Sequence, residues 1–126
     1  MKMKQPLGLF EGFGVELEYM IVSQDDLSVC PCSDEIIRQV AGKYESEVSL
    51  GSLAWCNEVV LHVIEIKTNG PASSLGALPQ IFYSNILRIN TFLETLNATL
   101  LPTGMHPFMN PLEDTRLWPH EYSAVY

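Results

Sequence analysis

Hydrophobic and polar residues alternate with a period of two in several stretches of the chain, which is the pattern of half-buried strands. The two clearest are residues 13–22 and 59–68, which are dense in β-branched or aromatic residues. A shorter strand is expected at 99–103, and a brief return strand at 27–29. Residues 44–54 alternate weakly around a Gly-Ser pair, which is compatible with a hairpin or a loop.

Two helices are predicted between these strands. Apolar residues recur at spacings of three and four over residues 78–96, which predicts a long amphipathic helix. A shorter helix is expected from an N-cap at Ser33 to Ala41, ending at Gly42. The pattern favours an α+β fold in which helices pack on one face of an antiparallel sheet. A chain of 126 residues suits a single domain over 1–126, complete or part of a larger one.

The chain is acidic, with a formal net charge of -8 and only 7 lysines and arginines. This balance argues against nucleic acid and against anionic membrane surfaces as partners, and it suits cations. No apolar run approaches the ~18 residues that a membrane span needs, and no secretory signal is apparent. Three cysteines, an odd number, fit a reduced compartment better than a disulfide scaffold, so a cytoplasmic location is expected.

Acidic residues interrupt both long strands. Glu16 and Glu18 are two residues apart and therefore project from the same face of their strand, while Glu65 lies in an otherwise apolar run. Close carboxylates repel each other unless a cation lies between them, and a hard divalent metal ion is the natural candidate. The alternative is a strand edge with solvated acids. Glu58 is a weaker fourth candidate ligand, because its odd offset from Glu65 places it on the opposite face unless a bulge or turn near Asn57 intervenes.

Three basic or titratable residues are further candidates for a functional role. Lys67 shares the face of Glu65 and could form an ion pair or hold a phosphate. His106, in the loop after the third strand, is either a structural residue or a donor to a phosphate or developing oxyanion. His62 is expected to be a core histidine rather than a zinc ligand, since Cys30 and Cys32 are spaced too closely for common zinc motifs. Without a phosphate-binding glycine motif, any nucleotide would have to be held through metal ions.

Three segments together resemble motifs of the second glutamate–cysteine ligase family, carboxylate–amine ligases related to glutamine synthetase. Residues 14–19 (Gly-Val-Glu-Leu-Glu-Tyr) resemble its first-strand motif, Gly-Val-Glu-x-Glu followed by an aromatic residue. Residues 63–68 (Val-Ile-Glu-Ile-Lys-Thr) resemble its Val-Glu-Ile-(Arg/Lys)-Thr motif. Residues 103–108 (Thr-Gly-Met-His-Pro-Phe) are similar to its Gly-Thr-His-Pro-Phe motif, with Met105 in place of the usual threonine.

The resemblance implies an ATP-dependent ligase. In such enzymes ATP phosphorylates the γ-carboxylate of glutamate, and the amine of cysteine attacks the acyl phosphate, as in glutathione biosynthesis. Mg²⁺ or Mn²⁺ ions held by acids on an antiparallel sheet neutralise the phosphates. Residue by residue, the resemblance implies metal-binding roles for Glu16, Glu18 and Glu65.

The resemblance covers only the N-terminal part of the longer family members, so a chain inactive by itself is expected. The alternative to a catalytic chain is a non-catalytic interaction module that keeps this half of the fold and associates with itself. An unpaired sheet edge and a high apolar fraction both favour a homo-oligomer, most simply a dimer.

Overall fold

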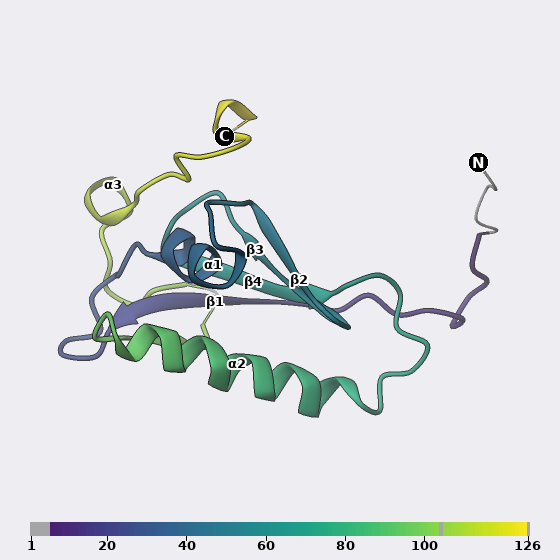
Figure 1. Cartoon of the computed structure of the whole chain (residues 1–126). Coiled ribbons are helices and arrows are strands. Elements are labelled where there is room, and N and C mark those ends of the chain that lie inside the picture. The colour runs from purple at the N-terminus through teal and green to yellow at the C-terminus, as the bar shows by residue number, and fades with distance from the viewer. Residues whose placement is uncertain (1–5, 104, 126) are drawn as a thin grey trace.

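The computed structural model of the chain describes residues 6–103 and 105–125. Its centre is a five-stranded antiparallel sheet with the strand order β2-β3-β4-β1-β5 (Figure 1). The strands are β1 (Glu16–Ser23), β2 (Glu47–Leu50), β3 (Leu53–Asn57), β4 (Val63–Thr68) and β5 (Ala98–Leu101). The helices are α1 (Ser33–Ala41), α2 (Leu78–Glu94), α3 (Pro111–Asp114) and the 3-10 helix η1 (Ser123–Val125). The predicted α+β class with an antiparallel sheet is confirmed.

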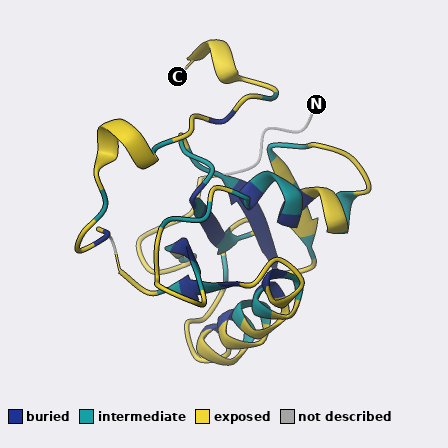
Figure 2. Ribbon diagram, turned by 90° about the vertical axis from the view of Figure 1, so that its left-hand side faces the viewer, coloured by how far each residue is buried: buried dark blue, intermediate teal, exposed yellow. Residues whose placement is uncertain are grey.

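One face of the sheet carries the hydrophobic core. Ile21 of β1, Ile64 and Ile66 of β4 and Trp55 of β3 project from this face and are fully buried. Helices α1 and α2 join them in one cluster, to which they contribute Ile36, Ile37, Phe82, Ile89 and Leu93. The buried residues lie in the sheet and on the inner sides of these helices, whereas the C-terminal segment is mostly exposed (Figure 2). Both helices therefore cover the same face, and the opposite face carries the acids of β1 and β4 together with apolar residues such as Met20 and Val22.

The predicted cap of α1 was wrong in one detail. Ser33 is the first helical residue rather than the N-cap, which is Cys32. Ser33 is drawn into the core because its backbone N–H donates to the carbonyl of Leu61 at 2.9 Å, and its hydroxyl has no partner. The other end is as predicted, since Gly42 has a φ of 80° and its N–H bonds back to Arg38.

The other predicted boundaries of helices and strands differ from the observed ones mainly where the chain turns. Residues 44–54 do contain a hairpin, β2–β3, and the predicted strand at 27–29 is only an isolated bridge between Val22 and Val29. The predicted strand 59–68 becomes regular only at Val63. The predicted strand 99–103 corresponds to β5, and α2 ends at Glu94. None of the helices in the described ranges has the length and apolar character needed to cross a bilayer.

The C-terminal segment holds the connection between β3 and β4 in place. Leu61 donates its N–H to Arg116, and Trp118, which is almost fully buried, donates its backbone N–H to Val59. His120 contacts Asp34 of α1 at 2.8 Å. Residues 58–62 are therefore fixed by contacts with a distant part of the sequence, and this matters because the connection contributes to the site.

Candidate metal centre

The register of β1 and β4 brings the acids of both strands together. Glu18 lies directly opposite Glu65, and Glu16 lies opposite Lys67. The period of two places these four side chains on the sheet face opposite to the helices. The prediction that Glu16, Glu18 and Glu65 share one face of neighbouring strands is confirmed by this register.

Three carboxylates form a compact group. Each of Glu18, Glu58 and Glu65 offers an oxygen atom, and these atoms all lie within 4.8 Å of one another. Glu58 reaches the group because β3 ends at Asn57, so a turn rather than a regular strand carries it to this face. Glu65 is only 8% exposed, whereas Glu18 is open to solvent. Among the described residues, Glu16 lies outside the group, one rung further along β1.

Lys67 compensates part of the negative charge. Its Nζ lies 3.2 Å from a carboxylate oxygen of Glu65 and 3.2 Å from one of Glu47, on the edge strand β2. A hydrogen bond to the Cys56 sulfur, and further ones to Glu47 and Glu65, raise the pKa of Lys67. Glu47 and the contact between Cys56 and Lys67 were missed by the sequence analysis. Alternation along β2 and β3 could have found them, because Glu47 pairs with Cys56 and Cys56 with Glu65.

The negative charge that Lys67 does not neutralise affects the pKa of Glu58. Burial raises the pKa of this carboxyl, and the charges of Glu18 and Glu65 raise it further. The group thus carries more negative charge than Lys67 neutralises, and all its donors are hard carboxylate oxygens. Mg²⁺ and Mn²⁺ prefer such ligands, so the residues present fit the ion that the family resemblance implies.

We expect Glu58 to make stability depend on pH. Because its pKa is higher in the folded than in the unfolded chain, its contribution to stability is complete below the ordinary carboxyl pKa. That contribution is lost as the pH rises through the folded-state pKa. Without metal, Glu58→Gln should therefore be more stable than the wild type at pH 7, and its advantage should shrink towards pH 4. Urea unfolding at both pH values tests this, with Glu94→Gln on α2 as the control; an advantage that does not change with pH would contradict it.

His106 is held by the protein itself. Its side chain is buried, Nε2 lies 2.6 Å from the carbonyl oxygen of Leu27, and Nδ1 accepts the backbone N–H of Phe108 at 3.3 Å. These contacts require a neutral ring protonated at Nε2. Gly104 of this motif lies outside the described residues. In this structure His106 anchors the loop after β5 to the loop after β1, and neither ring nitrogen is left for a phosphate.

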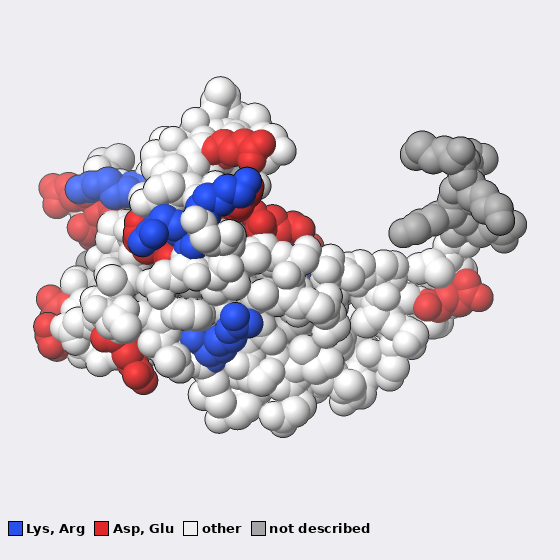
Figure 3. Space-filling view, in the orientation of Figure 1, with Lys and Arg blue, Asp and Glu red and all other residues white. Residues whose placement is uncertain are grey.

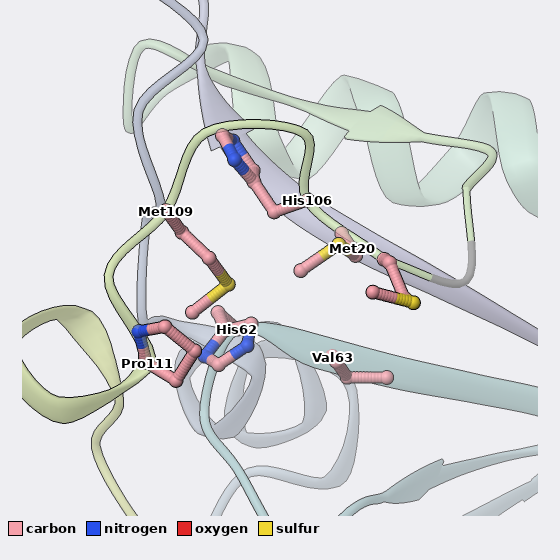
Figure 4. A pocket seen from close by; sticks show the side chains of 7 residues that line it. Met20, His62, Val63, His106, Met109 and Pro111 are labelled. Atoms are coloured by element: carbon pink, nitrogen blue, oxygen red, sulfur yellow. The ribbon is translucent and has the colours of Figure 1, made fainter.

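A cavity of about 370 Å³ is lined in part by residues next to the paired acids along the same two strands. Met20 and Val63 face each other one rung beyond Glu18 and Glu65, on the same face of the sheet, and form one wall. The other lining residues come from the loop before β4, from the loop between β5 and α3, and from the first position of α3 (Figure 4). They are His62, Met105, His106, Met109 and Pro111.

The comparisons with known proteins do not assign a function to this site. No family model matches the chain, and no solved structure matches it. A protein of Archaeoglobus fulgidus described as uncharacterized is 30% identical to the chain over 113 residues. This alignment covers 90% of the chain and 30% of the archaeal protein, so the chain spans just under a third of that relative.

Proposed function

We propose that the chain provides the metal-binding portion of an ATP-dependent carboxylate–amine ligase of the glutamate–cysteine ligase type. The observation that carries the proposal is the direct pairing of Glu18 with Glu65, with Glu58 beside them. Glu18 and Glu65 come from two separate motifs of the resemblance, and the fold joins them in one group. If carboxylates had come together by chance, there would be no reason for one residue of each motif to occupy directly paired positions of β1 and β4.

The chain's own residues would hold and orient the ion. Glu18, Glu58 and Glu65 offer the oxygen ligands, and a divalent ion bound there would neutralise the phosphates of ATP during transfer to a carboxylate such as that of glutamate. Lys67 fixes the position of Glu65 through their 3.2 Å contact. We assign Lys67 and His106 to positioning, since each is already bonded within the chain. Glu16 would be an outer acid that adds negative charge to the site.

Nucleotide binding tests this function in the chain as it stands. A fluorescent ATP analogue should bind in the presence of Mg²⁺, with its anisotropy rising over a protein titration. Glu65→Gln or excess EDTA should weaken binding at least about tenfold, which corresponds to about 1.4 kcal/mol. Glu94→Gln, an equivalent change on an exposed helix position, should not. Binding that is indifferent to both Mg²⁺ and Glu65 would contradict the proposal.

Self-association is a second candidate function, and the surface over α2 favours it. Leu75, Tyr83 and Leu87 are each about half exposed there. The face in Figure 3 carries few charged side chains over α2 and the loop before it. An apolar cavity of about 250 Å³ opens beside them, between the start of β1 and the start of α2. Contiguous apolar surface of this kind is typical of protein–protein contacts.

We therefore expect a two-fold dimer that uses the α2 surface. Light scattering coupled to size-exclusion chromatography should give twice the monomer mass at high micromolar concentration. Leu87→Glu should shift the chain to monomer, because it places a charge in the contact. Leu112→Glu, at a position that is 95% exposed on α3, is the matched control and should leave the dimer intact. A wild-type monomer throughout a dilution series would rule out this candidate.

A further inference from the structure

Two cysteine thiols lie in contact at the start of α1. The sulfur atoms of Cys30 and Cys32 are 3.7 Å apart, and both thiols are free. Pro31 alone separates them in the sequence, so the close spacing that argues against a zinc motif also brings the two sulfurs together. A disulfide bond is about 2.0 Å long, so a movement of under about 2 Å, shared between two side chains, would close it.

The backbone on both sides of the pair is held by other parts of the fold. Cys30 donates its N–H to the carbonyl of Ile21 on β1 at 2.9 Å. Ser33, directly after Cys32, donates its N–H to the carbonyl of Leu61 at 2.9 Å, and the carbonyl of Cys32 accepts two N–H groups of the first turn of α1. The fold therefore presents the two sulfurs to each other, which gives a reaction between them a high effective concentration.

Capping of α1 does not explain the second cysteine. Cys32 is the N-cap residue, a position that favours serine, threonine, aspartate and asparagine because their side chains accept a backbone N–H. The side chain of Cys32 makes no such bond. Among the described residues, each of the two sulfurs has the other as its hydrogen-bonding partner. The thiols are thus available to a reagent from solution.

The pair is also within reach of such a reagent. Pro31 is exposed, and Cys30 and Cys32 are both half-buried. Cys56, the third cysteine, lies in β3 and is only 4% exposed. A reagent that approaches from solvent therefore meets the pair before it meets Cys56.

We propose that Cys30 and Cys32 form a reversible disulfide by exchange with a low-molecular-weight disulfide. The ring that closes spans only three residues, so it gains little from loop closure and is readily reduced again. In a reducing compartment, disulfides of this kind are transient and respond to the redox state. The inference goes beyond the proposed function and does not rest on the metal site.

The exchange proceeds in two steps. The Cys30 thiolate attacks one sulfur of the small disulfide, which breaks its S–S bond, forms a mixed disulfide at Cys30 and releases one small thiolate. The Cys32 thiolate then attacks Cys30 Sγ and expels the second small thiolate. The two protons of the protein thiols end on the two small thiols, so one disulfide is reduced as the other forms.

The surroundings of Cys32 set the order of these steps. Burial raises the pKa of its thiol, and the neighbouring Cys30 and the acids Asp34 and Glu35 raise it further. Cys32 therefore stays protonated while Cys30 makes the first attack. Once Cys30 is bound in the mixed disulfide, its negative charge is gone. Cys32 then ionises more readily and completes the ring.

Oxidised glutathione is the probe that tests the proposal on the whole chain. Reduced protein is incubated with an excess of it, alkylated under denaturing conditions and mapped by peptide mass spectrometry. Cys30 and Cys32 should be joined in one internal disulfide while Cys56 is alkylated, and excess reduced glutathione should restore both thiols. Persistent glutathione on Cys30, a disulfide between two chains or through Cys56, a disulfide that reduced glutathione leaves intact, or no loss of thiols would overturn the inference.

Two serine variants test the order of the steps. Cys32→Ser should stop after the first step and carry at least about ten times more mixed disulfide at Cys30 than the wild type. Serine is a favoured N-cap, so this variant should keep α1, which circular dichroism checks. Cys56→Ser is the matched control and should oxidise like the wild type. Equal amounts of mixed disulfide in Cys32→Ser and the wild type would contradict ring closure by Cys32.

Discussion

Millimolar Mn²⁺ should raise the thermal unfolding midpoint of the wild-type chain and should leave that of Glu65→Gln unchanged. An ion that binds only the folded state stabilises it in proportion to the logarithm of its concentration relative to Kd. Three protein carboxylates give few ligands for an octahedral ion, so weak binding is expected. At ten times Kd the gain is about 1.4 kcal/mol, which for a domain of this size raises the midpoint by roughly 5 °C.

Glu65 is the decisive position because it is the buried member of the group and lies opposite Glu18. Glutamine keeps its size and can still accept a hydrogen bond from Lys67, while the ligand charge is removed. Glu18→Gln should reduce the shift as well. Glu94→Gln should retain the full shift, since Glu94 lies on α2, the helix that packs against the opposite face of the sheet. An equal Mn²⁺ shift in Glu65→Gln and the wild type would contradict a metal role for these residues.

Trp55→Ala should cost the most stability of the substitutions considered, about 3–5 kcal/mol. The side chain is fully buried in the core face of β3. Its Nε1 donates to Asn85 of α2 at 2.9 Å, and its ring packs edge-on against Phe92 at 6.3 Å. The guanidinium of Arg88 lies 5.3 Å from the ring centroid. Alanine would leave a cavity and an unpaired amide oxygen where the sheet and α2 meet.

Urea unfolding followed by circular dichroism measures this loss. Leu112→Ala, a change at an almost fully exposed position, should fall within about 0.5 kcal/mol of the wild type. A loss below about 1 kcal/mol for Trp55→Ala would mean that α2 is not held to the sheet through this residue. The prediction concerns the fold alone and is independent of any ligand.

The shared face of Glu16, Glu18 and Glu65 could be predicted because it depends on local rules. Alternation fixes the side on which each strand residue projects, and two apolar strands with acids at matching positions are good candidates for neighbours. The long helix α2 could be predicted for a similar reason, because its apolar stripe repeats over several turns. These features require no knowledge of distant contacts.

The position of Glu58 and the presence of the cavity could not be predicted from the sequence, because both depend on contacts between residues that are far apart in the chain. Residues 59–62 have strand-like composition, yet Val59 and Leu61 bond to the distant residues Trp118 and Arg116 instead of continuing β4. That detour turns Glu58 towards the other acids and places His62 in the cavity. Ser33 shows the same limit, since a long-range bond to Leu61 overrode its preference for the cap position.

The most direct test of the central claim is the site of paramagnetic broadening by Mn²⁺. In ¹H–¹⁵N spectra, substoichiometric Mn²⁺ should broaden the amide signals around Glu18, Glu58 and Glu65 first. Signals from the exposed side of α2 should stay sharp, and in Glu65→Gln the selective broadening should disappear. Broadening centred on another acidic segment, such as Glu113 and Asp114 of α3, or spread evenly over the surface, would contradict a metal site on this sheet.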